Sequence, residues 1–242
     1  AAETAASLAS HHPEYSRLAA RICVDDLHRS TKGTFTDVIT DLREYIDPES
    51  NKHAPLISEE VYTVIMENAE VLNNHIDYSR DNYYDYFGFK TLERSYLLRL
   101  DGEIAERPQD LWMRVALTVS CDEFNFDIVK KTYDMLSKGL YTHATPTLFN
   151  SRLKMQQLSS SFLIGMEDDS IEGIFSTLKD CALISKWAGG IGLHLHNIRA
   201  KNSMIRGTNG ISNGIVPMLR VFNNTARSVS YTHLTLPTNR EV

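Results

Sequence analysis

Two glycine-rich stretches, residues 188–192 and 206–214, offer backbone groups that could contact an anion. Glycine permits close approach of the main chain, and successive N–H groups can face a phosphate. Four cations lie near these stretches in a chain that is otherwise acidic: Lys186, Arg199, Lys201 and Arg206. The pattern favours a small phosphorylated ligand, with a plain turn as the alternative. Neither stretch has the spacing of a Rossmann or P-loop motif.

Three consecutive serines, residues 159–161, precede an apolar run, and three acids, residues 167–169, follow it. No G-x-S-x-G setting surrounds the serines, which disfavours an acyl-transfer nucleophile. Their hydroxyls could instead donate to a phosphate or a sugar. The acids fit a helix start, where carboxylates are favoured near free N–H groups. The functional alternative for these acids is a ribose hydroxyl acceptor.

The histidine pairs His11-His12 and His194-x-His196 have no third ligand at usable spacing, so no metal site is predicted. Their alternative role is that of ordinary surface or core histidines.

Composition narrows the function classes. The net charge of −6 over 242 residues disfavours general nucleic-acid binding. No apolar run is long enough to span a membrane. The cysteines, Cys23, Cys121 and Cys181, lie far apart, which disfavours a disulfide framework and indicates a reducing, cytoplasmic setting.

The elements that must position the second-half residues form a β-α-β pattern. Residues 158–164 predict a buried strand. Apolar residues at helical spacing from Ile171 to Ala182 predict a helix capped by Asp169 or Ser170. The glycine stretch 188–192 is expected as a loop that leads into an alternating strand at 193–196. A crossover between parallel strands is the natural interpretation.

The first half is expected to be mainly helical. Residues 1–31, an amphipathic segment from Phe35 through Ile46, and one segment spanning 61–72 all show helical periodicity. Asp101-Gly102 predicts a tight hairpin turn within 97–105. Helices are expected to resume after Pro108 and around 128–136, the latter ended by Gly139.

Five ordered motifs carry a family resemblance: FGFKTLERSYLL (87–98), AERPQ (105–109), THATPTLFN (142–150), DDSIEGI (168–174) and CALISK with AGGIG (181–192). Together they closely resemble the large subunit of eukaryotic-type class I ribonucleotide reductase. The resemblance runs in order from residue 1 to about 227.

This resemblance implies a mainly α N-terminal half followed by the start of a ten-stranded α/β barrel, incomplete in this sequence. The expected divisions are an ATP-cone remnant (1–31), a helical connection (32–84), the helical N-terminal domain (85–155), the barrel start (156–227) and a non-native tail (228–242). Arg29 stands where the family usually has a lysine that contacts the activity effector. We expect an N-terminal fragment, because the chain begins without Met inside a helix and the radical-bearing cysteine would lie beyond residue 242.

The resemblance also implies two nucleotide sites. The substrate, a ribonucleoside diphosphate, would contact Thr145, Ser160, Ala188, Gly189 and Gly190. A deoxynucleoside triphosphate or ATP, with Mg, would act as specificity effector at Asp169, Ser170, Ile171, Lys186, Arg199, Arg206 and Gly207. Helices at 170–187 and 214–226 would pack on their copies in a homodimer and place the effector between the subunits. A small diiron subunit would supply the radical, and thioredoxin or glutaredoxin the electrons.

Ser161 departs from the family. The family has a reducing cysteine at this position, and a serine hydroxyl cannot form the disulfide that the reduction leaves behind. Residues 151–156 differ from the family loop as well. Two interpretations follow: a reductase large subunit whose fragment is inactive here, or a catalytically inactive homologue that acts through nucleotide binding, dimerisation and protein partners.

Overall fold

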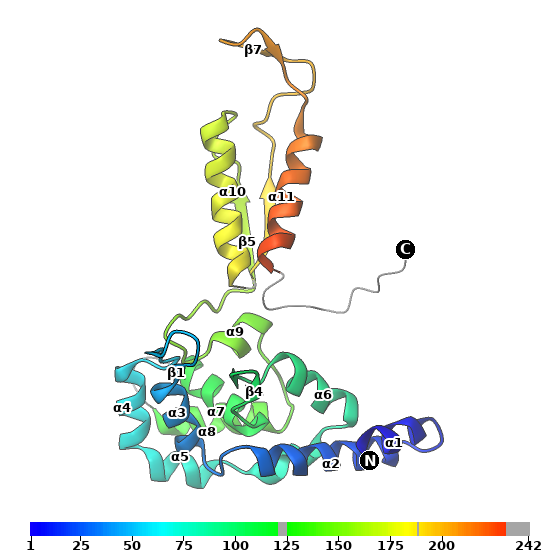
Figure 1. The fold of residues 1–242 in the computed structure, drawn as a ribbon, viewed down its shortest axis with the longest axis vertical. Helices are drawn as coiled ribbons and strands as arrows, with labels where there is room; N and C mark the ends of the chain where they lie inside the picture. Colours follow the sequence, from blue (N-terminus) through cyan, green and yellow to red (C-terminus); the bar gives the residue numbers. More distant parts are fainter. Residues whose placement is uncertain (121–124, 188, 231–242) are drawn as a thin grey trace. The chain divides into compact units, whose positions relative to one another are not determined.

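The computed structural model of the chain describes residues 1–120, 125–187 and 189–230. They form two compact units, residues 1–158 and the residues from Ser159 onward (Figure 1). Cys121, Ala188 and the part of the expected tail beyond residue 230 lie outside the described residues.

The first unit is mainly helical, as the sequence predicts. Its helices are α1 (Ala2–Ser7), η1 (Leu8–Ser10), α2 (Glu14–Ser30), α3 (Phe35–Glu44), α4 (Glu59–Glu67), α5 (Ala69–His75), η2 (Tyr78–Tyr83), α6 (Tyr86–Ser95), α7 (Pro108–Val119), α8 (Phe126–Ser137) and α9 (Thr145–Asn150). Two short antiparallel hairpins interrupt them: β1 (Ile46–Asp47) with β2 (Lys52–His53), and β3 (Arg99–Leu100) with β4 (Glu103–Ile104).

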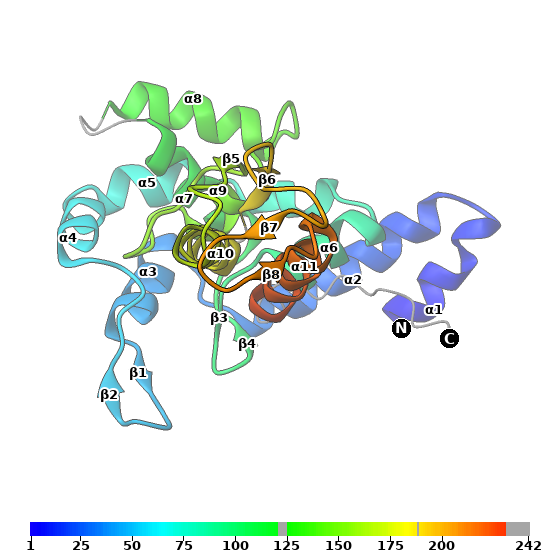
Figure 2. The same cartoon turned by 90° about the horizontal axis from the view of Figure 1, so that it is seen from above.

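Helix α3 ends earlier than its apolar pattern suggests. Thr34 caps its start by accepting a hydrogen bond from the Asp37 N–H, and Phe35, Val38, Ile39 and Leu42 are buried. Ile46, expected on the same face, instead lies in β1 and is 56% exposed. The prediction was wrong there because the helix stops at Glu44 and the chain turns into a hairpin, which projects from the helices of this unit in Figure 2.

The segment expected as one helix at 61–72 is two helices. Asn68 separates α4 from α5, and its side-chain amide donates to the Val64 carbonyl at 2.8 Å. Such local bonding by asparagine competes with the helical ladder. The hairpin turn at Asp101-Gly102 is confirmed: both residues have positive φ, 51° and 84°. Gly139, with φ 69°, follows α8 as expected.

Helix α7 is the buried centre of the first unit. Every residue from Pro108 to Leu117 is buried, including Trp112 and the charged Arg114. The main hydrophobic cluster gathers residues of α2, α3, α6, α7 and α8 around it. A helix that is buried all round presents all its side chains to neighbours, so its polar residues must find partners inside the protein.

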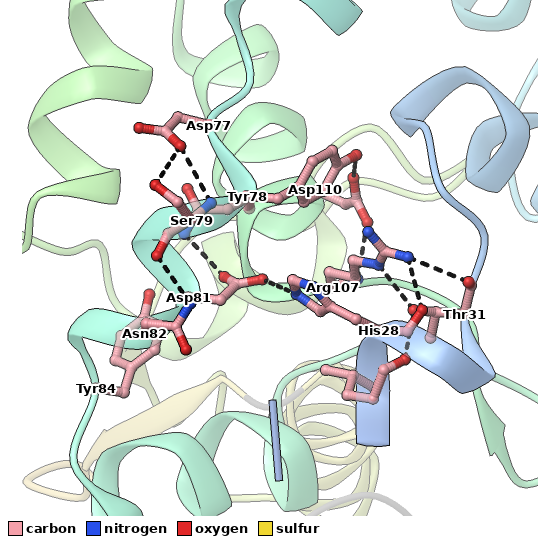
Figure 3. Close-up of polar contacts among 12 residues, drawn as sticks. His28, Thr31, Asp77, Tyr78, Ser79, Asp81, Asn82, Tyr84, Arg107 and Asp110 are labelled. Atoms are coloured by element: carbon pink, nitrogen blue, oxygen red, sulfur yellow. Dashed lines mark hydrogen bonds and ion pairs between the residues drawn. The ribbon is translucent and has the colours of Figure 1, made fainter. Parts of the chain in front are cut away.

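A buried polar network fixes the start of α7 against the end of α2 (Figure 3). The Arg107 guanidinium donates to the His28 carbonyl at 2.9 Å and to Thr31 Oγ1 at 2.9 Å, and lies over the Tyr78 ring. The Tyr78 hydroxyl donates to Asp110 at 2.6 Å. In the same network, Asp81 lies 2.7 Å from His28 Nε2 and accepts from Gln109. These contacts join α2, η2 and α7.

The second unit contains the predicted β-α-β crossover. Its elements are β5 (Ser161–Gly165), α10 (Ile171–Lys186), β6 (Gly190–His194), β7 (Met204–Ile205), β8 (Gly210–Ile211) and α11 (Ile215–Ser230). Strands β5 and β6 are parallel, with Ser161 opposite Gly190 and Gly165 opposite His194. Helices α10 and α11 lie side by side in both views (Figures 1 and 2). A small core of Met166, Cys181 and Phe222 lies within this unit.

Two predictions about these strands were wrong. The strand begins at Ser161 rather than Leu158, and it is not buried: Leu163 is 95% exposed. Ile164 packs on the small core, whereas the opposite face of the two-stranded sheet has no cover among the described residues. The glycine stretch is also mostly strand, because β6 begins at Gly190.

Helix α11 continues through Ser230, past the expected boundary at residue 227. Among the described residues, no helix combines the length and the apolar character that a membrane crossing requires.

The buried carboxyl of Asp110 makes stability depend on pH. Burial raises its pKa to about 7, although hydrogen bonds from Tyr78 and from the Arg107 N–H favour the ionised form. The folded protein therefore holds this proton between about pH 4 and 7 while the unfolded chain releases it. We expect this group to lower the free energy of unfolding as pH rises across that range, by at most about 1.4 kcal/mol per pH unit.

Urea unfolding at pH 4.5, 5.5 and 6.5 tests this expectation with Asp110→Asn. The variant should lose that part of the pH slope, while Asp26→Asn, an exposed control, should keep it. Identical slopes in Asp110→Asn and the unsubstituted chain would contradict the assignment.

Candidate nucleotide-binding sites

The first candidate site is built on the short helix α9, which begins at Thr145. The Thr145 hydroxyl lies 3.3 Å from the Tyr96 hydroxyl, and the Tyr96 ring stacks on Phe149 at 5.2 Å between centroids. A helix of six residues has little stability of its own, so its position depends on such tertiary contacts.

A buried ion pair between Glu106, just before α7, and Arg114 within α7 supplies several of those contacts. Arg114 donates to both oxygens of Glu106, at 3.0 and 2.8 Å, and both side chains are almost fully buried. The same guanidinium donates to the carbonyls of Leu148 at 3.1 Å and Ser151 at 2.7 Å, at the end of α9. Glu106 also accepts from the Leu98 N–H. The pair therefore fixes α9 and the β3–β4 hairpin to α7.

Helix α9 in turn holds the segment that leads to the serines. Thr147 Oγ1 donates to the Leu158 carbonyl at 3.2 Å, and the Asn150 side chain donates to the Gln157 carbonyl at 2.8 Å. Both partners are backbone groups within three residues of Ser160. The helix thus carries one expected substrate contact, Thr145, and holds residues 157 and 158 at the end of the first unit.

Ser160 and Ser161 are both exposed, and Ser161 is the first residue of β5. The Gly190 N–H donates to the Ser160 carbonyl at 2.8 Å, and the Gly189 N–H donates to the Ile184 carbonyl. The sequence pattern suggested these two N–H groups as anion donors, but each is engaged within the chain.

Packing alone requires glycine at position 189. A Cβ there would lie 2.6 Å from Ile184 Cγ2 and 2.9 Å from the Phe162 ring. The glycine lets β6 start close against α10 and β5. Ala188, its neighbour in the expected substrate contact, lies outside the described residues.

The second candidate site lies at the start of α10. Ser170 caps this helix by accepting from the Gly173 N–H at 3.1 Å, which settles the choice between Asp169 and Ser170. Asp169 instead pairs with Arg199: Arg199 Nε donates to the carboxylate at 2.6 Å, and Nη2 donates to the Asp169 carbonyl at 3.0 Å. The carboxylate is thus fixed by a side chain 30 residues further along the chain.

This ion pair borders a pocket of about 360 Å³ between α10 and α11. Four expected effector residues line it: Asp169, Ser170, Ile171 and Arg199. Apolar side chains supply most of the remaining wall, among them Phe175, Met218 and Val221. The pocket therefore suits a ligand whose aromatic or apolar group contacts the apolar wall and whose polar part lies at the charged rim.

The other expected effector residues do not line this pocket, although Ile205, next to Arg206, does. Lys186 stands at the far end of α10, about 22 Å along the helix axis from Ile171 at 1.5 Å per residue, and its ammonium lies 5.1 Å from the centre of the Trp187 ring. Arg206 and Gly207 are exposed residues of the turn between β7 and β8, and Gly207 has φ 95°. Within one chain, these residues do not meet at one point.

Arg29 is exposed and pairs with Asp25 at 2.6 Å, one helical turn earlier on α2. It shares a shallow pocket with Ala1, Ile22 and Cys23.

The histidine pairs have local partners. His12 Nδ1 accepts from the Glu14 N–H at 3.2 Å, and the rings of His194 and His196 stack at 4.1 Å. No cluster of three or more metal-ligating side chains occurs among the residues that the structure describes. The Cys181 thiol is packed in the small core, and burial raises its pKa, so it stays a neutral thiol.

Comparison with known families gives two consecutive matches. The family described as "Ribonucleotide reductase, all-alpha domain" matches residues 83–156, and "Ribonucleotide reductase, barrel domain" matches residues 159–233. The two matches abut close to the boundary between the two compact units.

Curated relatives agree over 229 residues, or 95% of this chain. The chain is 58% identical to the ribonucleoside-diphosphate reductase large chain 2 of Saccharomyces cerevisiae, 56% to the large subunit of Arabidopsis thaliana and 54% to that of Vaccinia virus. The chain belongs to the ribonucleoside-diphosphate reductase large-chain family. It spans 26%, 28% and 29% of the length of these three relatives.

Family membership gives the two units their names. The first ends in the all-alpha domain of ribonucleotide reductase, and the second is the beginning of its barrel domain. The described part of the second unit contributes one parallel strand pair with its crossover helix, and no closed barrel is seen within it. The expected fold class is thus confirmed at this coarser level.

Sequence reasoning missed the side chains that support Thr145 in this reductase-family chain. A signal was present: Arg114 stands inside the otherwise apolar run LWMRVAL of a predicted helix. A charge in such a run requires a buried partner. The run did not reveal that the partner would be Glu106 or that α9 would supply carbonyl acceptors.

Removal of one partner tests the buried pair. We expect Glu106→Gln to lower the free energy of unfolding by about 3–5 kcal/mol, because it leaves the Arg114 charge buried without a carboxylate. Urea unfolding measures the loss. Glu103→Gln, on the exposed side of the neighbouring hairpin, is the matched control and should change stability by less than about 0.5 kcal/mol. Equal effects of the two substitutions would contradict the role of the pair.

Proposed function

We propose that the full-length protein carrying this chain is the large subunit of a ribonucleoside-diphosphate reductase, which converts ribonucleoside diphosphates to deoxyribonucleoside diphosphates by radical chemistry for DNA precursor synthesis. The observation that carries this proposal is the continuous family match, at 54–58% identity in the three relatives above, across both units. The word "large" in the relatives' names supports a small-subunit partner, which would supply the radical from its diiron centre. Thioredoxin or glutaredoxin would supply electrons.

The proposed substrate contacts are the hydroxyls of Thr145 and Ser160 and the backbone near 188–190. Two features support them. Thr145 begins a helix that is held at both ends, and Ser160 is exposed beside the first strand of the barrel domain. Hydroxyl groups donate readily to phosphate oxygens, which only accept.

The proposed effector is a deoxynucleoside triphosphate or ATP with Mg, at the pocket between α10 and α11. The Asp169 carboxylate suits a ribose hydroxyl, and Arg199 suits a phosphate through charge-assisted hydrogen bonds. The apolar wall suits a base. Lys186 lies too far along α10 to serve the same nucleotide within one chain, which supports an arrangement in which it serves the nucleotide of a second copy. The exposed side chains of Phe175, Leu183 and Val221 support such a homodimer contact through α10 and α11.

Thermal unfolding of the full-length gene product tests the effector proposal. Saturating dGTP, dTTP or ATP with Mg should raise the melting temperature by a few degrees, since a ligand at 100 times its Kd stabilises by about 2.7 kcal/mol. Asp169→Asn should weaken effector binding about tenfold, through loss of a charge-assisted bond to the ribose. Asp180→Asn, an exposed carboxylate on the same helix, should bind as the unsubstituted protein does. Equal affinity in the Asp169→Asn variant would refute the site.

Ser161 decides between two functions. It starts β5 opposite Gly190, where the family resemblance expects a reducing cysteine. Reduction of the substrate at its 2′ carbon takes two electrons from a pair of thiols, which become a disulfide, and the oxygen leaves as water. A serine hydroxyl cannot enter that disulfide, and the core thiol of Cys181 is no substitute. This residue supports the second candidate, a catalytically inactive homologue that keeps nucleotide binding and dimerisation.

Reduction of a ribonucleoside diphosphate by the full-length product, with its small subunit and dithiothreitol, separates the two. The protein with Ser161 should show no multiple turnover, and Ser161→Cys should raise turnover at least about a hundredfold if the rest of the site is intact. A Ser161→Cys protein that still binds nucleotides but does not turn over would favour the inactive homologue. Normal turnover with Ser161 in place would show that this position is not the reducing one.

A further inference from the structure

We propose that Tyr96 is a positioning residue for the substrate: its hydroxyl donates to Thr145 and thereby directs the Thr145 hydrogen toward a phosphate oxygen of the nucleoside diphosphate. This inference rests on the proposed function, because it assumes that Thr145 contacts the diphosphate. Tyr96 itself would not touch the substrate.

Contacts with α6 and α9 hold Tyr96 in place. It directly follows α6, and its N–H donates to the Leu92 carbonyl at 2.9 Å. Its ring stacks on Phe149 with an interplanar angle of 16°. Phe149 belongs to the same helix as Thr145, so this aromatic contact places Tyr96 beside α9.

The far end of α9 is fixed as well. The Arg114 guanidinium donates hydrogen bonds to the Leu148 and Ser151 carbonyls, and the Glu106 carboxylate balances its charge. Rotation or sliding of α9 would break these bonds. The 3.3 Å separation of the Tyr96 and Thr145 oxygens is therefore held from both ends of the helix.

The direction of the hydrogen bond follows from what a phosphate can do. Each hydroxyl has one hydrogen, and either could donate in this pair. A diphosphate oxygen only accepts, so Thr145 must give its hydrogen to the substrate. Tyr96 must then be the donor to Thr145, and that donation also polarises the Thr145 hydroxyl toward the phosphate. The order Tyr96 to Thr145 to phosphate satisfies all three groups.

Tyr96→Phe tests this order because it removes only the hydroxyl and keeps a ring to stack on Phe149. The measurement is the Kd of ADP and CDP for the full-length gene product, by equilibrium dialysis, which does not depend on turnover at Ser161. We expect Tyr96→Phe to weaken binding about three- to tenfold, the range of one lost hydrogen bond, with an unchanged melting temperature. Tyr45→Phe, which removes a hydroxyl bonded to Asp101 at the tip of the β3–β4 hairpin, is the matched control and should bind normally.

A double-substitution cycle separates positioning from general support. Thr145→Val should weaken binding about tenfold, Thr145→Ser should retain it, and Tyr96→Phe should have no further effect once Thr145 is Val. Additive losses would overturn the proposal, as would normal binding by Tyr96→Phe. If Thr145→Val binds as tightly as the unsubstituted protein, the substrate contact itself fails and the inference falls with it. Normal effector binding in every variant shows that a loss is local to the substrate site.

Discussion

The helical unit depends on one buried ion pair, Glu106 with Arg114. Desolvation of two charges costs several kcal/mol, and the cost is offset only where the geometry supplies hydrogen bonds to the remaining donors and acceptors. Here Glu106 accepts from Arg114 and from the Leu98 N–H, and Arg114 also donates to the three carbonyls of Leu148, Phe149 and Ser151 at the end of α9. This ion pair thus fixes two elements that have little stability alone: the β3–β4 hairpin, whose strands are two residues long, and the six-residue helix α9.

Arg107, the residue after Glu106, connects α7 to a different helix. Arg107 donates to the end of α2, while Glu106 faces α9 through Arg114. Two consecutive side chains just before α7 therefore connect α2 with the helix that carries Thr145. The second unit has no comparable buried pair among its described residues, and its charged contact, Asp169 with Arg199, lies at the rim of a pocket. That exposure suits the nucleotide site proposed there.

Local signals predicted much of the fold. Ser170 caps α10, one of the two caps that the sequence offered, and Asp101-Gly102 turns the hairpin because both residues adopt positive φ. Tertiary context decided the rest. Ile46 keeps the helical period but falls in a strand, and the β5 strand has apolar composition although Leu163 stays exposed. The apolar residues of β5 could be buried on both faces of a complete sheet. In the two-stranded sheet of β5 and β6, only one face packs on the small core.

The candidate site residues could likewise be predicted only in part from the sequence. Family motifs located Thr145, Ser160 and Asp169, but they did not reveal which of these residues share a pocket. Lys186 is one example. It lies seventeen residues after Asp169, and because most of those residues form one helix, the two side chains are too far apart within one chain to contact the same nucleotide. The supporting residues Tyr96 and Arg114 act through contacts between distant segments, which spacing along the chain does not encode.

Amide hydrogen exchange of the chain tests most directly whether α7 holds α9 rigidly. The N–H groups of Leu148 and Ser151 donate within α9 and its cap. If the Arg114 contacts hold the helix, these amides should be protected to within about tenfold of the buried amides of α7, since both would exchange through the same opening of the unit. Exchange of the α9 amides at the rate of an unstructured peptide, while α7 stays protected, would contradict the account.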